Sequence, residues 1–166
     1  MVEKNKLTKP HKISKIPATK PYQSIMAINL AADQKRMEQS LKILIIDDEE
    51  PVLSNLCSFL KFKNYDVTSA SDGLEGLELF ENDPKGFDLI ITDIVMPKIS
   101  GMSLISIIKE KSPEIPVIAI TGWGEFPDAF ALDSQADKVL SKPFELSELD
   151  KTIDEIISSK KQSVLD

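Results

Sequence analysis

Two patterns of apolar and polar residues alternate along the chain from residue 42 onward. In the first, short runs are almost purely apolar, as in Ile43-Leu44-Ile45-Ile46, and they predict strands buried on both faces of a parallel sheet. In the second, apolar residues recur at spacings of three and four, which indicates amphipathic helices. Because strands alternate with helices, we predict a doubly wound α/β fold with helices on both faces of the sheet. The five predicted strands are residues 43–46, 65–70, 87–93, 117–121 and 139–142.

Three of the predicted elements differ from the rest. The strand at residues 65–70 is the most polar, so we expect it near an edge of the sheet. The helix between the fourth and fifth strands is the least clear, because Gly122, Gly124 and Pro127 crowd its start. A last helix is predicted over residues 146–157. We expect its apolar side chains to pack in the core, and the alternative is that they form a homodimer interface.

The first 40 residues differ from the rest in charge and pattern. They carry a net charge of +5 and show no apolar period, whereas residues 41–166 carry a net charge of −12. We predict a basic, flexible N-terminal extension over residues 1–40, a folded domain over residues 41–160 and a C-terminal tail over residues 161–166. The apolar patch at residues 24–32 is interpreted as a short docking helix, with a secretory signal peptide as the less favoured alternative.

Composition narrows the chemistry that the domain can perform. Of the 166 residues, 42% are hydrophobic and 28% are charged, which is typical of globular proteins. No apolar run approaches the ~20 residues that cross a bilayer, so we expect a cytoplasmic protein without a membrane contact. The single cysteine, Cys57, excludes a disulfide framework, and the single histidine, His11, excludes a Ser-His-Asp triad within the domain. Any metal is then bound by oxygen ligands, which favours magnesium, calcium or manganese, and the acidic domain is a poor candidate for DNA binding.

Polar residues follow or end four of the five predicted strands. Asp47 and Asp48 follow the first strand, Asp93 ends the third, Thr121 ends the fourth and Lys142 ends the fifth. Ligands of open α/β sheets bind at the carboxyl ends of the strands. The sequence therefore predicts that these side chains form a site at one edge of the sheet.

The residue types at this edge favour phosphoryl chemistry. Three crowded carboxylates repel one another, so at least one pKa should rise unless a cation is bound, and magnesium prefers such oxygen ligands. A carboxylate can also act as a nucleophile and form an aspartyl phosphate. The hydroxyl of Thr121 and the ammonium of Lys142 would then stabilise the phosphoryl group during transfer.

The chain resembles a known family, the response-regulator receiver domains, which are the phosphoacceptor modules of two-component signalling. The resemblance covers residues 41–160, and it implies a flavodoxin-like (βα)5 fold with a five-stranded parallel sheet of order 2-1-3-4-5. It is carried by five motifs: Ile45-Ile46-Asp47-Asp48-Glu49-Glu50-Pro51, Asp88-Leu89-Ile90-Ile91-Thr92-Asp93-Ile94-Val95-Met96-Pro97, Ser100-Gly101-Met102, Ile120-Thr121-Gly122 and Ser141-Lys142-Pro143-Phe144.

The resemblance implies a role for each residue of the predicted site. Asp93 would be the phosphoacceptor, and Thr121 and Lys142 would bind the phosphoryl oxygens. It also implies a cis Lys142–Pro143 bond. Magnesium, with manganese as the alternative, would have four ligands: Asp47, Asp48, Asp93 and the backbone carbonyl of Val95.

The function that the resemblance implies is that of a stand-alone receiver in a phosphorelay. Such a domain accepts a phosphoryl group from a histidine kinase or a histidine phosphotransfer protein. It then signals through phosphorylation-dependent interaction with a downstream protein. We do not expect an enzyme beyond the domain's own phosphoryl transfer and dephosphorylation.

One position departs from the family pattern. Receivers usually carry Tyr or Phe three residues before the lysine, and this chain carries Val139 there. The usual aromatic report of phosphorylation is therefore not expected. Trp123, Phe126 and Phe130 are candidates for shaping a different output face.

Three other functions fit the sequence less well. A non-phosphorylated interaction module would not need the polar residues at the strand ends. A phosphohydrolase would need a second carboxylate two residues after its nucleophile, but Asp93 is followed by Ile94 and Val95. Flavin binding is disfavoured because no phosphate-binding loop of Ser, Thr and Gly follows the first strand.

Overall fold

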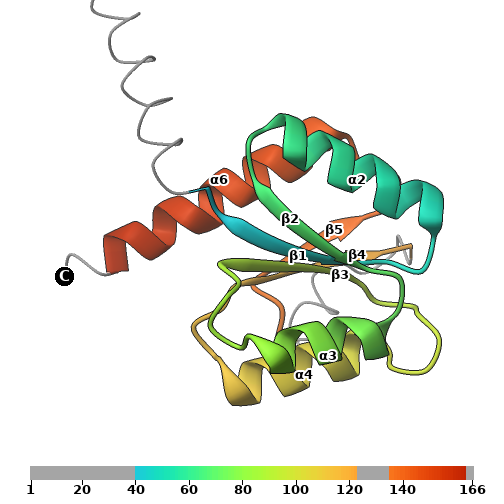
Figure 1. Ribbon diagram of the computed structural model, residues 1–166. Helices are drawn as coiled ribbons and strands as arrows, with labels where there is room; N and C mark the ends of the chain where they lie inside the picture. The colour runs from blue at the N-terminus through green and yellow to red at the C-terminus, as the bar shows by residue number, and fades with distance from the viewer. Residues whose placement is uncertain (1–39, 123–134, 164–166) are drawn as a thin grey trace, which may run out of the picture. The chain divides into compact units, whose positions relative to one another are not determined.

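The computed structural model describes residues 40–122 and 135–163, which contain a five-stranded parallel sheet (Figure 1). The strand order is β2-β1-β3-β4-β5, as predicted, and the polar strand β2 lies at an edge, also as predicted. Each strand differs from its predicted bounds by no more than two residues at either end. The strands are β1 (Lys42–Ile46), β2 (Asp66–Ala70), β3 (Leu89–Asp93), β4 (Val117–Thr121) and β5 (Lys138–Ser141).

Helices cover both faces of this sheet, which confirms the doubly wound α/β fold. Figure 1 shows α2 and α6 on one face, and α3 and α4 on the other. The helix predicted between β4 and β5 falls on residues 123–134, outside the described residues, as do residues 1–39 of the predicted extension. The helices are α2 (Glu50–Phe62), α3 (Gly73–Asn82), α4 (Gly101–Lys111) and α6 (Leu146–Ser163). None of these helices is long and apolar enough to cross a membrane.

Two apolar clusters hold the helices on the sheet. Ile43 and Ile45 of β1 point into the cluster with α2 and α6, and Leu44 and Ile46 point into the cluster with α3 and α4. All four side chains are fully buried, and burying one such side chain contributes roughly 2 kcal/mol. Every residue of β3 and β4 is buried as well. This burial explains why residues 89–91 and 117–120 are unbroken apolar runs.

The start of α4 packs directly against the end of β3, and this contact needs a glycine. Ser100 caps the helix by accepting a hydrogen bond from the backbone N–H of Ser103 at 3.3 Å. A Cβ atom on Gly101 would lie 2.0 Å from the backbone oxygen of Asp93 and 2.8 Å from Cα of Ile94. Both neighbours are backbone atoms, so the end of β3 itself would have to move.

We therefore expect Gly101→Ala to destabilise the domain. Overpacking of this kind costs about 2 kcal/mol, which corresponds to a fall in Tm of roughly 5–10 °C for a domain of this size. Thermal unfolding followed by circular dichroism measures the change. Gly122→Ala is the control, because a Cβ atom there would meet no atom of the described residues within 4 Å. Equal melting temperatures for Gly101→Ala and the wild type would contradict the close contact.

Candidate functional site

The polar residues predicted at the strand ends come together at one edge of the sheet. Asp47 follows β1, Asp93 ends β3, Thr121 ends β4 and Lys142 follows β5. The sheet order places β1, β3, β4 and β5 side by side, so the four residues come from consecutive strands. Asp47, Asp93 and Thr121 are buried, with 1%, 5% and 2% of their surface exposed. Three polar side chains buried this deeply at one edge need charged or hydrogen-bonding partners there.

Lys142 provides the charge that joins these residues. Its Nζ atom lies 2.9 Å from Oδ1 of Asp93, 3.2 Å from Oδ2 of Asp47 and 2.8 Å from Oε1 of Glu49. A lysine ammonium has three N–H donors, so these three carboxylates match its donors in number. The Lys142–Pro143 bond is cis, which confirms that prediction.

The carboxylate of Asp93 is held in a defined orientation by the backbone that follows β3. Its Oδ2 atom accepts a hydrogen bond from the backbone N–H of Val95 at 2.7 Å. The N–H of Ile94 donates to the carbonyl of Ile120 in β4 at 2.9 Å, which fixes the chain between them. Since Oδ2 is held by Val95, Oδ1 is the oxygen that faces Lys142.

Asp47 shows the raised pKa that the sequence predicted for the carboxylate group, although the main cause is a different one. Burial in the sheet edge is the largest effect on the pKa of Asp47 and raises it. Hydrogen bonds from the N–H of Glu49 and from Lys142 act in the opposite direction, and repulsion by Asp93 is the smallest effect. The prediction placed like-charge repulsion first, but Lys142 lies between the two carboxylates and offsets most of it.

The pKa of Lys142 is raised as well. Burial lowers this pKa, but hydrogen bonds to Glu49 and Asp93 and the charges of Asp93 and Asp47 outweigh burial. The hydrogen bond from Lys142 lowers the pKa of Glu49. Lys142 therefore keeps its positive charge at neutral pH.

Comparison with known proteins agrees with this geometry. A family model described as the response regulator receiver domain matches residues 43–154. The chain belongs to this family. It is 33% identical over 111 residues to the response regulator MprA of Mycobacterium ulcerans, which covers 66% of this chain and 47% of MprA. It is 31% identical over 140 residues to the sensor kinase CckA of Brucella abortus, which covers 79% of this chain and 15% of CckA.

Solved receiver domains have the same fold. A response regulator receiver domain protein from Clostridium thermocellum is 36% identical, with a TM-score of 0.68, over 74% of this chain and 98% of that one. A CheY-like receiver domain protein from Methanospirillum hungatei is 28% identical, with a TM-score of 0.69, over 75% and 99% of the two chains. The chain thus spans about half of MprA and a small part of CckA, but nearly all of these two solved receiver domains.

The metal ligands predicted for the receiver are only partly assembled. Lys142 contacts both Asp47 and Asp93, whereas Asp48 is exposed. Within residues 40–122 and 135–163, no three Asp, Glu, His or Cys side chains are grouped closely enough to hold a metal ion. The donors are nevertheless all oxygen atoms, and Asp47 and Asp93 are buried carboxylates, which is the chemistry that magnesium prefers. The binding of magnesium by Asp47, Asp48, Asp93 and the carbonyl of Val95 stays a prediction.

Glu49 is the site residue that the sequence did not single out. It lies in the acidic run after β1, and its backbone N–H donates to Oδ1 of Asp47 at 2.8 Å. Its side chain contacts a lysine that is 93 positions further along the chain. The only local signal was that Glu49 belongs to the same acidic run as Asp47 and Asp48.

The position that departs from the family pattern has a packing role. Val139 lies on β5, is half-buried and packs against the apolar cluster on the α3 and α4 side of the sheet. Trp123, Phe126 and Phe130, which were predicted to shape the output face, lie outside the described residues. An output face built on them therefore stays a prediction.

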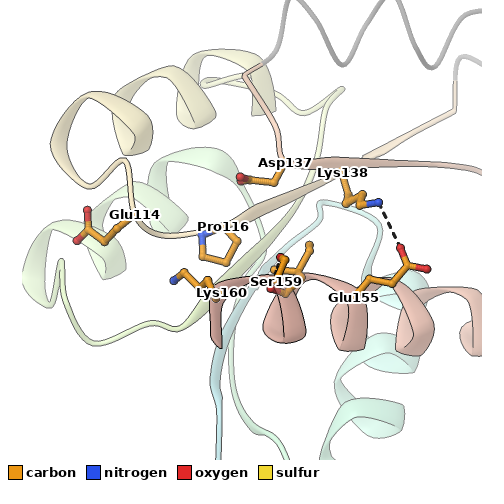
Figure 2. Close-up of a pocket in the computed structure, with 8 residues that line it drawn as sticks. Glu114, Pro116, Asp137, Lys138, Glu155, Ser159 and Lys160 are labelled. Atoms are coloured by element: carbon orange, nitrogen blue, oxygen red, sulfur yellow. Dashed lines mark hydrogen bonds and ion pairs between the residues drawn. The ribbon is translucent and has the colours of Figure 1, made fainter. Parts of the chain in front are cut away.

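A second hollow lies at the opposite edge of the sheet and does not belong to this site. It has a volume of about 370 Å³ and is lined by residues before β4, at the start of β5 and in α6 (Figure 2). Lys138 and Glu155 form an ion pair across it at 3.2 Å, and Asp137 accepts a hydrogen bond from Lys109 at 2.6 Å. Lys138, Glu155 and Asp137 each have a charged partner, and we assign no ligand to this hollow.

Proposed function

We propose that the domain accepts a phosphoryl group on Asp93 from the phosphohistidine of a histidine kinase or a histidine phosphotransfer protein. The phosphorylated domain then signals by binding a downstream protein partner. One observation supports this proposal above all. Asp93 is buried at the end of β3, with Oδ2 held by the N–H of Val95 at 2.7 Å and Oδ1 facing Lys142 at 2.9 Å. A carboxylate with one anchored oxygen and one oxygen beside a cation is prepared for phosphoryl transfer.

The proposed step forms one bond and breaks another. A carboxylate oxygen of Asp93 attacks the phosphorus atom, the bond between phosphorus and oxygen forms, and the bond between phosphorus and the donor imidazole nitrogen breaks. The imidazole departs with the electron pair of that bond and is neutralised by a proton. The ammonium of Lys142 and the hydroxyl of Thr121 stabilise the charge on the phosphoryl oxygens.

Magnesium bound by Asp47, Asp48, Asp93 and the carbonyl of Val95, or manganese in its place, would supply additional positive charge beside the transferred group. The protein residues would do the rest, because Val95 orients the nucleophile and Lys142 pairs with the product. Receiver domains are signalling phosphoacceptors and not enzymes in the usual sense. We therefore propose that this chain catalyses only its own phosphorylation and dephosphorylation.

Labelling with a small phosphodonor tests the proposal. We expect the wild-type protein, incubated with acetyl phosphate and magnesium, to gain a single phosphoryl group in intact mass spectra. Borohydride reduction followed by peptide mapping should place the group on Asp93. Addition of EDTA should suppress the gain. A label on another residue, or labelling that EDTA does not change, would contradict the proposed chemistry.

A further inference from the structure

Glu49 differs from the other two carboxylates around Lys142 because it is exposed. Its side chain is 61% exposed, compared with 1% for Asp47 and 7% for Asp93. Glu49 is the N-cap residue of α2, but its side chain makes no capping hydrogen bond to the helix. Instead, Oε1 accepts a hydrogen bond from Lys142 at 2.8 Å. The side chain of Glu49 therefore pairs with the lysine and does not cap its own helix.

The remaining contacts of Lys142 overlap with those that a divalent cation would need. Its Nζ atom lies within 3.2 Å of Oδ2 of Asp47 and 2.9 Å of Oδ1 of Asp93. A divalent cation held by these oxygens would repel the ammonium, which keeps its charge at neutral pH. Lys142 must then withdraw from both buried carboxylates.

A withdrawing ammonium needs another partner, and Glu49 already provides one. The side chain of Glu49 is 61% exposed, whereas those of Asp47 and Asp93 are buried, so Glu49 pairs with Lys142 at the solvent-accessible part of the site. The hydrogen bond between them can persist while the contacts to Asp47 and Asp93 break. Lys142 then stays beside Glu49, from where it can pair with a phosphoryl group on Asp93.

We propose that Glu49 is a positioning residue, which holds Lys142 at the solvent-accessible part of the site and so allows a divalent cation to displace the ammonium from Asp47 and Asp93. Without Glu49 the ammonium keeps, among the described residues, only the two buried carboxylates as ion-pair partners, and the cation must compete with it more strongly. The inference rests on the proposed function, since it concerns the same pocket.

Cation binding tests this role without any phosphorylation. Mn²⁺ is added to the full chain, and the free ion is counted by electron paramagnetic resonance. We expect Glu49→Gln to weaken Mn²⁺ binding about threefold, which lies within the range for an exposed ion pair. The matched control is Glu50→Gln, which removes the same charge from the neighbouring exposed residue and should change binding by less than about twofold.

A double-mutant cycle separates the effect through Lys142 from a direct one. In the Lys142→Met background, or in Lys142→Gln should the first not fold, Glu49→Gln should no longer weaken Mn²⁺ binding. Undiminished weakening in that background would overturn the proposal, because Glu49 would then act on the cation directly. Equal weakening by Glu49→Gln and Glu50→Gln would overturn it too, since only total charge would matter.

Phosphorylation kinetics supply a further readout. In Glu49→Gln we expect the half-saturating Mg²⁺ concentration for labelling to rise about threefold, with an unchanged rate at saturating Mg²⁺. An unchanged Mg²⁺ requirement would overturn the role of Glu49 and leave the proposed function intact. Absence of labelling in the wild type would instead overturn the proposed function. The double-mutant cycle on Mn²⁺ binding would still test the role of Glu49.

Discussion

Asp93→Asn is expected to abolish phosphoryl gain while the domain stays folded. The carboxamide has nearly the same shape as the carboxylate, and its oxygen can still accept the hydrogen bond from the N–H of Val95, which now measures 2.7 Å. A neutral amide oxygen is a poor nucleophile and cannot form a stable acyl phosphate. Intact mass after incubation with acetyl phosphate and magnesium should therefore show no added phosphoryl group.

The matched control for this variant is Asp66→Asn. Asp66 is an exposed aspartate at the start of the edge strand β2, so the same chemical change is made outside the site. We expect this variant to be labelled to the wild-type extent. Full labelling of Asp93→Asn would show that another residue is the acceptor, and the assignment of Asp93 would be wrong.

Lys142→Met should have the second large effect, on both labelling and stability. The variant keeps the long apolar stem and loses the charge that faces Asp93 and Asp47. Loss of one preorganised charge at a reacting group lowers rates by about 10²–10³, so labelling should slow by that factor. The two buried carboxylates also lose a hydrogen-bond partner, which costs about 1–3 kcal/mol of stability at pH 7.

The stability loss in Lys142→Met should depend on pH. In the wild type, Lys142 lowers the pKa of Asp47 and so opposes the larger effect of burial. Without the lysine this pKa rises further above that of the unfolded chain. A group with a raised folded pKa favours the folded state at low pH, and this contribution is lost as pH rises through the folded pKa. The difference in Tm between variant and wild type should therefore be largest near pH 7 and shrink on acidification.

Lys63→Met provides the control for Lys142→Met. Lys63 forms an ion pair of 2.8 Å with Asp150 of α6, and its side chain is 33% exposed. We expect this variant to lose some stability and to be labelled at the wild-type rate. A labelling rate that falls equally in both variants would mean that stability, and not the charge of Lys142, controls labelling.

The sheet was predictable from the sequence because its central strands are buried on both faces. Residues 43–46 and 117–121 are nearly unbroken apolar runs, and the structure places β1 and β4 there. The end of the last helix was less visible. The apolar period stops at Ile157, but α6 continues to Ser163, because polar residues can extend a helix without packing on the core.

The buried part of the site followed from topology, whereas its exposed part did not. Asp47, Asp93 and Lys142 could be grouped because the ends of parallel strands meet at one edge. Glu49 could not be assigned in this way, since its partner lies 93 residues away and exposed acidic residues are common near helix starts. The need for glycine at position 101 was equally hidden, because it depends on the path of the backbone after Asp93.

The ion-pair network around Lys142 joins parts of the chain that are far apart in sequence. Its contact with Asp47 spans 95 residues, from the end of β1 to the residue after β5. These groups meet only when the sheet is complete, so a ligand held between them binds the folded chain and not the unfolded one. Ligand binding at this site and the folding equilibrium of the domain are therefore thermodynamically linked. The midpoint of thermal unfolding should rise with the concentration of a ligand that binds there, so it reports how strongly the ligand binds.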